Sequence, residues 1–228
     1  MGPLVIITGA THGIGRALAQ AFAREKHPLL LIARHSAVID GLADVPHRFA
    51  EMDVADFARF QAAVKEAEAA FDPTDCLVNN AGFLHVGDFR SRSVYDLDHD
   101  IDVLLKGVVH GIRAVLPGMS ARKGGTIINV SSIGDRKPGP SGETYHASKA
   151  AVRSLTESLQ QAEAKNNVRI INIAPGFVKT NIHAGIGISF EEYCRVTGNP
   201  VSSRPNGSPT SFSSATSSRR RSASATLW

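Results

Sequence analysis

The sequence predicts an α/β protein built on a doubly wound parallel sheet. Two observations lead to this prediction: short apolar runs recur along the chain, and segments with helical periodicity separate them. A third observation is a glycine cluster directly after the first apolar run. Strands that alternate with helices at this spacing form βαβ units, whose helices cover both faces of the sheet.

Six runs predict the strands. Each is short and bounded by turn residues, and most are rich in valine, isoleucine or leucine. In chain order they are Leu4–Thr8, Leu29–Ala33, Arg48–Met52, Cys76–Asn79, Gly125–Ser131 and Val168–Ala174.

Four amphipathic segments predict the helices between these strands. In residues 56–71, Phe57, Phe60 and Val64 form one apolar stripe, and Asp56 stands in the first turn. In the third helix, Pro117 should perturb the last turns because proline lacks a backbone N–H. The four ranges are Ile14–Glu25, 56–71, His99–Ala121 and Glu143–Ala164.

Charge is unevenly distributed over the 228 residues, whose formal net charge is +4. Residues 201–228 contain four arginines, ten serines and no acidic residue, so the first 200 residues balance 21 basic against 21 acidic side chains. A basic surface over the whole domain, which would favour nucleic-acid binding, is therefore not expected. We expect a domain over 1–200 and a disordered tail over 201–228, because the tail buries too little apolar surface to offset its chain entropy.

Cysteine usage and the N-terminus indicate the compartment. Cys76 and Cys194 are the only cysteines, too few for a disulfide framework or, by themselves, for a zinc site. The N-terminus has no basic region before its apolar run, and no run approaches the ~20 apolar residues that cross a bilayer. We therefore expect a soluble, cytoplasmic protein with no bound metal and no membrane partner.

The glycine cluster joins the first predicted strand to the first predicted helix, as phosphate-binding loops do. One glycine permits a tight turn, and another permits close approach to a pyrophosphate, whose oxygens meet free N–H groups at the helix start. The alternative is a glycine-rich turn that only packs helix on strand. The cluster reads Thr8-Gly9-Ala10-Thr11-His12-Gly13-Ile14-Gly15.

Further motifs follow this loop in a fixed order. Asn79-Asn80-Ala81-Gly82 ends the fourth strand, Ser131-Ser132 ends the fifth, Tyr145-x-x-x-Lys149 comes next, and Pro175-Gly176-x-Val178-x-Thr180 follows the sixth. Together the motifs resemble those of the short-chain dehydrogenase/reductase family, from residue 4 to near residue 200. The resemblance implies a Rossmann-type sheet with strand order 3-2-1-4-5-6-7 and a nicotinamide cofactor.

The resemblance also implies three catalytic residues. Tyr145 would exchange a proton with the substrate oxygen, Lys149 would also bind the nicotinamide ribose, and Ser132 would position the substrate. Tyr145 and Lys149 lie four residues apart on a predicted helix and so share one face, where an ammonium favours a phenolate. Taken alone, the Tyr-x-x-x-Lys pair reads as an ordinary surface pair and Ser-Ser as an ordinary turn.

Other residues are expected to contact the cofactor by the same resemblance. Asp53 would meet the adenine, although it could instead cap the following helix, a role also open to Asp56. Thr180 would meet the nicotinamide carboxamide. The expected contacts are Gly9, Thr11, His12, Gly13, Ile14, Gly15, Arg34, Asp53, Val54, Asn80, Ala81, Gly82, Tyr145, Lys149, Pro175, Gly176, Val178 and Thr180.

Charge at the end of the second strand favours NADP(H) over NAD(H). An NAD site usually places a carboxylate there, against the ribose 2′-hydroxyl. Here Ala33 takes that position and Arg34 follows it, and a guanidinium binds a 2′-phosphate well. His12 could add a donor. The alternative is that Arg34 and His35 form a solvated polar end of the strand.

Two features depart from the family pattern. Leu104 stands where the family usually has an asparagine that helps to hold a proton-relaying water, and leucine has no donor or acceptor. We expect a catalytic handicap with an intact cofactor site. Residues 189–197 could begin a covering helix, but the C-terminal helix and seventh strand are missing from 201–228. A frameshifted C-terminus would explain this, because suitable codons read in another frame encode a helix and a strand-like run.

The sequence thus predicts an NADP-dependent short-chain alcohol dehydrogenase or carbonyl reductase acting on a small molecule. By resemblance, it would form a homodimer or homotetramer through the helices over 99–121 and 143–164. Two other hypotheses remain: a catalytically impaired NADP-binding homologue, and a protein that binds nucleic acid or a partner through its basic tail.

Overall fold

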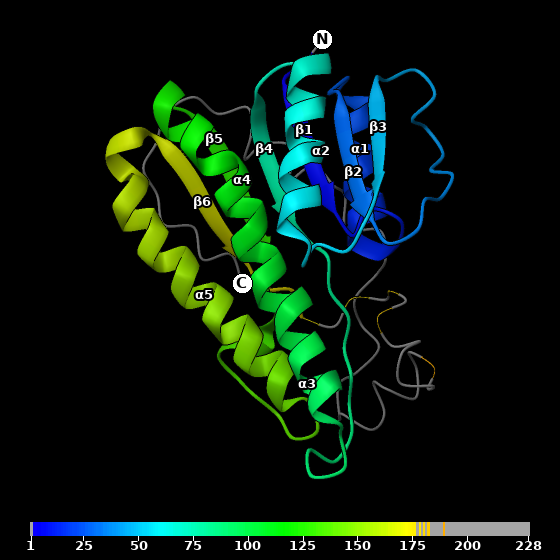
Figure 1. Cartoon of the computed structure of the whole chain (residues 1–228), viewed down its shortest axis with the longest axis vertical. Coiled ribbons are helices and arrows are strands. Elements are labelled where there is room, and N and C mark those ends of the chain that lie inside the picture. The colour runs from blue at the N-terminus through cyan, green and yellow to red at the C-terminus, as the bar shows by residue number, and fades with distance from the viewer. Residues whose placement is uncertain (1, 177, 179, 181, 183–188, 190–228) are drawn as a thin grey trace.

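Six strands form one parallel sheet in the computed structural model, which describes residues 2–176, 178, 180, 182 and 189. The strands are β1 (Leu4–Thr8), β2 (Leu29–Ala33), β3 (His47–Glu51), β4 (Thr74–Asn79), β5 (Gly125–Val130) and β6 (Val168–Ile173). Their order is β3-β2-β1-β4-β5-β6 (Figure 1). The predicted α/β fold is confirmed, as is the implied order of these six strands. The predicted tail and the expected seventh-strand position lie outside the described residues.

Helices connect the strands as predicted. The longer ones are α1 (Gly13–Arg24), α2 (Phe57–Ala70), α4 (Gly107–Arg122) and α5 (Glu143–Glu163), with α3 (Val94–Ile101) directly before α4. Three short turns are η1 (Asp102–Lys106), η2 (Ile133–Asp135) and η3 (Ala164–Asn166). Among the described residues, no helix is both long and apolar enough to span a membrane.

The third predicted helix differs from the prediction in its start and in one turn. It begins at Val94 rather than His99, because the Ser93 hydroxyl accepts a hydrogen bond from the Asp96 N–H at 3.1 Å and caps it. In η1 the chain widens into a π turn, in which the Gly107 N–H donates to the Asp102 carbonyl.

Pro117 does not interrupt this helix, because α4 continues to Arg122. Proline removes the N–H that the Arg113 carbonyl would otherwise accept. Both residues are exposed, so water can bond that carbonyl instead.

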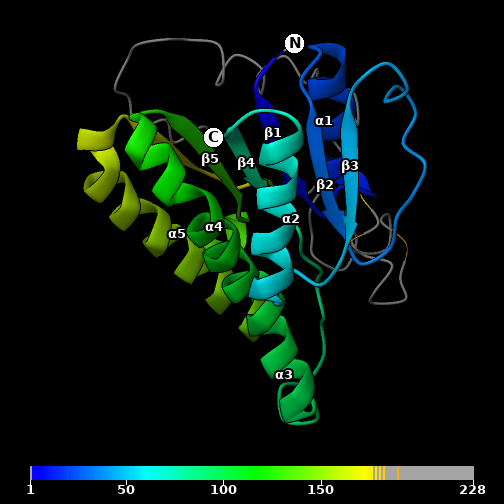
Figure 2. The same cartoon turned by 45° about the horizontal axis from the view of Figure 1, so that its top comes forward.

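Helices cover the two faces of the sheet unequally. In β1, Leu4 and Ile6 pack with α2, α4 and α5, whereas Val5 and Ile7 pack with α1 on the other face (Figures 1 and 2). This alternation is the pleat of a strand buried on both sides. β1 and β2 are buried along their whole length, but β6, at the end of the sheet within the described residues, is only partly buried.

A ladder of polar side chains crosses the core between β4, β5 and α5. Asn79 Nδ2 donates to Asn129 Oδ1 at 2.9 Å, and Asn129 Nδ2 donates to Thr156 Oγ1 at 2.9 Å. The Thr156 hydroxyl in turn donates to the Val152 carbonyl at 2.7 Å. Asn129 and Thr156 are fully buried, so these bonds stand in for the water that the groups lose on folding.

Replacing Asn129 with leucine should lower the free energy of unfolding by about 1–3 kcal/mol. Leucine is similar in size, but it leaves the Asn79 amide buried without its acceptor. Urea unfolding followed by circular dichroism measures the difference. Gln161→Leu, on the exposed side of α5, is the control and should change stability little. Equal stability of the Asn129 variant and the unmutated protein would contradict this account of the ladder.

Candidate active site

The predicted motifs meet at the carboxyl edge of the sheet, because parallel strands all end on the same side. The glycine loop follows β1, Asn80–Gly82 follow β4, Ser132 follows β5 and Pro175 follows β6. Between β1 and β4 the winding of the chain reverses, and ligands of open α/β sheets bind at such switch points. α3 extends past this edge of the sheet (Figure 2).

Glycines shape the loop between β1 and α1. Gly9 and Gly13 have φ of +65° and +52°, a region that glycine enters without strain. A Cβ at Gly15 would lie 2.2 Å from the Gly9 carbonyl oxygen, and a Cβ at Gly9 would lie 2.8 Å from the Cα of Ala81. The loop is thus tight and its backbone bare, so it fits the close approach of a dinucleotide pyrophosphate.

The side chains of this loop differ in exposure. Thr11 is buried and Ile14 is partly buried, whereas His12 is exposed, with its Nδ1 2.9 Å from the Thr11 hydroxyl. His12 stands at the N-cap of α1 but makes no side-chain cap bond. Thr180 lies beside the loop, because a Cβ at Gly13 would be 3.1 Å from its side chain.

Asn80 ties β4 to the glycine loop. Its side-chain amide donates to the carbonyls of Thr8 and Gly9, at 3.0 and 3.2 Å. The Thr8 hydroxyl accepts the backbone N–H groups of Asn80 and Ala81, both at 2.9 Å. Residues 79–82 therefore stiffen the loop as well as bordering it. Gly82, which is exposed, extends this segment toward the buried Lys149.

Arg34 follows β2 at the same edge and is exposed, and within the described residues it makes no hydrogen bond. Sequence analysis missed Glu51, which pairs with Ala33 in the register of β2 and β3. The Glu51 carboxylate accepts the Ser36 N–H at 2.7 Å, and hydrogen bonds from the side chain and then the backbone of Ser36 lower its pKa. The end of β2 therefore has a cation and a carboxylate close by, and only the register of β3 reveals the second.

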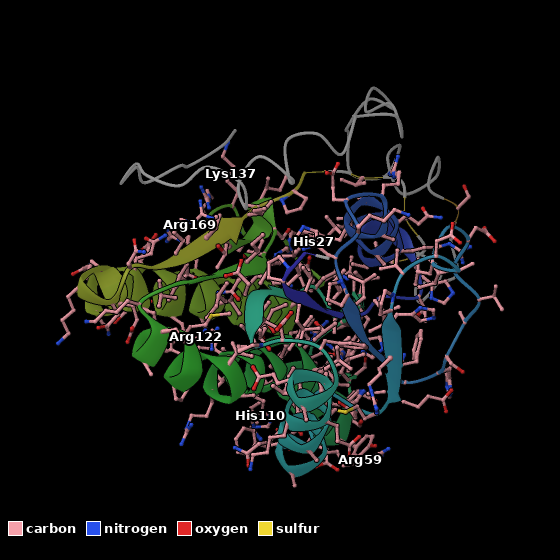
Figure 3. The ribbon with its side chains drawn as sticks, turned by 90° about the horizontal axis from the view of Figure 1, so that it is seen from above. His27, Arg59, His110, Arg122, Lys137 and Arg169 are labelled. Atoms are coloured by element: carbon pink, nitrogen blue, oxygen red, sulfur yellow. The ribbon has the colours of Figure 1, made fainter. Side chains whose placement is uncertain are left out.

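Asp53 and Val54 form the turn after β3. Asp53 Oδ1 accepts the Ala55 N–H at 2.9 Å, whereas Asp56 caps α2 by accepting the Arg59 N–H at 3.0 Å. The alternative role of Asp53 as the cap of α2 is therefore wrong. Val54 is buried, and its carbonyl lies 3.1 Å from Nδ1 of His110 on α4. Figure 3 labels His110.

The turn after β5 is joined to the end of β6. The Ser132 hydroxyl accepts the Gly134 N–H at 3.1 Å, which orients the serine at the start of η2. The Ile133 N–H donates to the Pro175 carbonyl at 3.1 Å. Beyond Pro175, Gly176 and Val178 are exposed.

Tyr145 and Lys149 lie one turn apart on α5, with the Lys149 ammonium 5.7 Å from the centre of the tyrosine ring. Both are nearly buried, with exposed fractions of 8% and 5%. Lys149 Nζ donates to the Val130 carbonyl, the last residue of β5, at 2.8 Å. Burial lowers the pKa of Lys149 to about 8, although the Asp135 carboxylate opposes this change. The pair is therefore anchored at the end of β5, directly before the turn that contains Ser132.

Leu104 occupies the π turn η1 and is fully buried. It packs with Leu84 and Tyr145, and Ile182 lies against the same cluster. A Cβ at Gly82 would be 3.1 Å from Leu104 and 3.8 Å from Lys149 Nζ. An apolar side chain thus stands close to the ammonium, where the resemblance led us to expect an asparagine.

A buried ion pair beside this cluster was missed by sequence analysis. Asp100 accepts hydrogen bonds from Arg92 at 2.7 Å and from the Thr144 hydroxyl, and His85 Nδ1 lies 2.9 Å from it. Burial would raise the pKa of Asp100, but the bonds from Arg92 and Thr144 outweigh it and lower that pKa. Because Thr144 precedes Tyr145, this ion pair fixes the first turn of α5.

A glycine-rich phosphate-binding loop at the switch point of the sheet, together with a Tyr–Lys pair at the carboxyl end of β5, defines a dinucleotide-binding α/β enzyme. Comparison with known proteins narrows this class. The family model described as short chain dehydrogenase matches residues 3–188. The chain therefore belongs to the short-chain dehydrogenase family, and it is a nicotinamide-dependent oxidoreductase.

Individual relatives agree with this assignment. The oxidoreductase UcpA of Salmonella typhimurium is 40% identical over 185 residues, which cover 78% of this chain and 70% of that protein. UcpA of Escherichia coli K12 is 41% identical over 186 residues, with the same shares.

Solved structures show the same fold. A 3-oxoacyl-[acyl-carrier protein] reductase from Brucella melitensis, in complex with NAD, has a TM-score of 0.77 and 28% identity, over 86% of this chain and 80% of that one. Serine dehydrogenase from Escherichia coli has a TM-score of 0.70 and 34% identity, over 76% of this chain and 82% of that one.

Proposed function

We propose that the protein is an NADP-dependent alcohol dehydrogenase or carbonyl reductase, which moves a hydride between the cofactor and a small carbonyl or alcohol substrate. The observation that carries this proposal is the pair Tyr145 and Lys149 on one face of α5, with Lys149 bonded to the last residue of β5, directly before the Ser131–Ser132 turn. The glycine loop follows β1 at the same edge of the sheet. A proton donor, its charge partner and a hydroxyl thus stand at one edge of the sheet.

Each of these residues has a distinct role in the proposal. Tyr145 gives a proton to the substrate oxygen during reduction and takes it back during oxidation. The Lys149 ammonium favours the phenolate that remains, and it has donors besides the one bound to Val130. Ser132 orients the substrate oxygen by a hydrogen bond. The nicotinamide cofactor supplies or accepts the hydride when bound.

The cofactor would lie along the carboxyl edge. Gly9, Thr11, Gly13 and Gly15 would hold the pyrophosphate, with Ile14 beneath it. Thr180, which lies near Gly13, would meet the nicotinamide carboxamide. Asp53, Val54 and residues 80–82 would border the adenosine, and the ammonium of Lys149 would meet the nicotinamide ribose. Pro175, Gly176 and Val178 would border the nicotinamide.

NADP(H) is the proposed cofactor because Arg34 is exposed and free of other hydrogen bonds among the described residues. His12, which is also exposed, stands in the loop next to α1. Glu51 acts against this preference, but its carboxylate is engaged by the Ser36 N–H. The Brucella relative was solved with NAD, so the two proteins would differ in cofactor choice.

Turnover should fall as the pH rises through about 8, the pKa to which burial lowers Lys149. Below that pH the side chain is an ammonium and supports the phenolate, and above it the side chain is neutral. The dependence of kcat on pH at saturating substrate measures this. A kcat that stayed flat between about pH 7 and pH 10 would show that the charge of Lys149 does not limit turnover.

The second candidate function is a catalytically impaired NADP-binding homologue, which the position of Leu104 favours. If leucine handicaps turnover, Leu104→Asn should raise kcat severalfold, because an amide next to Lys149 can bind a proton-relaying water. Steady-state kinetics measure the change, and circular dichroism checks the fold. A lower kcat in a folded variant would show that η1 has adapted to leucine.

Oligomerisation and compartment complete the proposal. The proposed homodimer or homotetramer forms through α4 and α5. Exposed apolar side chains at Val94 and Tyr95 of α3 and at Val109 of α4, with exposed fractions of 72%, 78% and 41%, favour an interface on this side of the molecule. A cytoplasmic location fits the low cysteine content. Burial raises the pKa of Cys76 to about 12, so its thiol stays protonated and unreactive.

The test is consumption of NADPH, followed at 340 nm, over a panel of aldehydes, ketones, keto acids and keto esters. The dehydrogenase proposal predicts turnover of at least one carbonyl class, and NADPH binding without turnover would favour the impaired homologue. Failure to bind either NADPH or NADH in a folded preparation would refute both.

A further inference from the structure

Asp135 is a buried carboxylate directly behind the candidate catalytic residues. It ends η2, three residues after Ser132, and none of its side chain is exposed. Nothing in the proposed reaction requires a carboxylate at this place, and the sequence motifs do not include it. Burying a charge is costly unless it is fully paired, so its contacts indicate what it does.

Four hydrogen bonds satisfy the carboxylate. Oδ2 accepts from the Ser131 hydroxyl at 3.0 Å, from Asn172 of β6 at 3.1 Å and from Arg136 Nη2 at 3.1 Å. Oδ1 accepts from Arg136 Nε at 2.6 Å. The Ser131 hydroxyl also lies 3.3 Å from the Lys149 carbonyl. Asp135 therefore links the ends of β5 and β6 to the turn of α5 that carries Lys149.

The charge of Asp135 is not cancelled by its partner. Burial would raise the pKa of Asp135, but the bonds from Arg136, Asn172 and Ser131 outweigh burial and lower it, so the group is ionised. The Arg136 side chain is 28% exposed, so water screens the cation more than the buried carboxylate. Asp135, and not Arg136, is the charge that acts on the pKa of Lys149.

Lys149 is the buried group on which the Asp135 carboxylate acts. Its surroundings in the described residues are otherwise uncharged: Val130 of β5 offers a carbonyl, Leu104 of η1 is apolar and Tyr145 of α5 is the neighbouring titratable group. Asp135 is the charge that opposes the effect of burial on the pKa of Lys149. The Arg136 guanidinium, in turn, faces two carboxylates that raise its pKa, first Asp135 and then Glu157 of α5.

We propose that Asp135 is a positioning residue, which clamps the Ser131–Lys149 contact and keeps the Lys149 side chain in its ammonium form. The hydrogen bonds and the charge of Asp135 can be tested separately. Three of the four bonds go to Oδ2, so an asparagine whose amide oxygen takes that place can keep the bonds from Ser131 and Asn172 without the charge. The inference rests on the function proposed above, since it assigns Asp135 to the support of the same Tyr145–Lys149 pair.

The test is an NMR titration of Lys149 in full-length protein labelled with ¹³C at lysine Cε. The Lys149 signal is the one that disappears in Lys149→Arg. Asp135→Asn keeps an oxygen for Ser131 and Asn172 but removes the charge, so the apparent pKa of Lys149 should fall by at least about half a unit. Ser131→Ala removes the clamp and leaves the charge, and it should leave that pKa nearly unchanged.

A second variant should shift the pKa of Lys149 in the opposite direction, so the test does not depend on whether Asp135→Asn folds. Arg136→Gln removes the compensating cation, so the pKa of Lys149 should rise, and this arm decides alone if Asp135→Asn does not fold. An unchanged or raised pKa in Asp135→Asn, or a lowered one in Arg136→Gln, would overturn the proposal. The titration needs no substrate, so failure of this inference is distinguishable from absence of dehydrogenase activity. In an active protein, the alkaline limb of kcat should shift with the pKa of Lys149.

Discussion

Tyr145→Phe should lower kcat by about 10²–10⁴-fold, the usual contribution of a general acid or base. NADPH affinity should stay nearly unchanged. Tyr145 is only 8% exposed, and its ring packs against Leu84 and Leu104. Phenylalanine keeps that ring and its packing. Only the hydroxyl that exchanges the proton is lost. Single-turnover kinetics and fluorescence titration of NADPH measure the two quantities separately.

Tyr95→Phe is the matched control, because Tyr95 is exposed on α3, where its ring stacks on His99. It should retain full turnover. Retention of more than a few per cent of activity by Tyr145→Phe would mean that another group exchanges the proton. A parallel loss of NADPH affinity would mean that the Tyr145 hydroxyl also holds the cofactor, because phenylalanine keeps the ring.

NADPH should bind roughly ten- to a hundredfold more tightly than NADH, and Arg34→Ala should remove most of that difference. A hydrogen bond to a charged phosphate contributes about 1.5–3 kcal/mol, which corresponds to this ratio. Arg34 is exposed at the carboxyl edge and can turn toward a 2′-phosphate without breaking another bond in the described part of the chain. Isothermal titration calorimetry with both cofactors measures the ratio.

Arg48→Ala is the control for loss of one positive charge on the neighbouring strand. Arg48 stands near the start of β3, at the amino ends of the strands and so at the far end of β3 from the proposed cofactor site. Its ion pair with Glu66 is long, at 3.9 Å, and exposed. The cofactor ratio should not change in this variant. Equal affinity of the unmutated protein for NADPH and NADH would refute the charge argument, and would point to Glu51 as the group that sets the balance.

The fold was largely predictable because its elements carry local signals. Apolar runs and alternation placed all six strands to within two residues, and the motif order implied their arrangement. The start of α3 was missed although Ser93 and Asp96 form a capping pair, because the longer apolar stripe began later. The π turn η1 had no sequence signal, although Gly107, whose N–H closes it, packs closely against Val54.

The candidate site was predictable only where short motifs mark it. The loop, Asn80, Ser132, Tyr145 and Lys149 occur at fixed spacings, and the parallel sheet brings their strand ends to one edge. The supporting charges could not be found in this way. Asp100, Asp135 and Glu51 acquire their roles from partners far along the chain, and only packing and strand register bring those partners close.

The amide ladder through the core has a consequence for how the chain reaches its fold. β4 and β5 are separated by a long stretch of sequence, so their pairing is a non-local contact that must close a long loop. If β5 docked one residue out of register, Asn129 would turn to the opposite face and Asn79 would be enclosed without an acceptor. Such a misaligned intermediate would be less stable and would reopen readily. The ladder therefore favours, during folding, the one strand register in which both amides are paired.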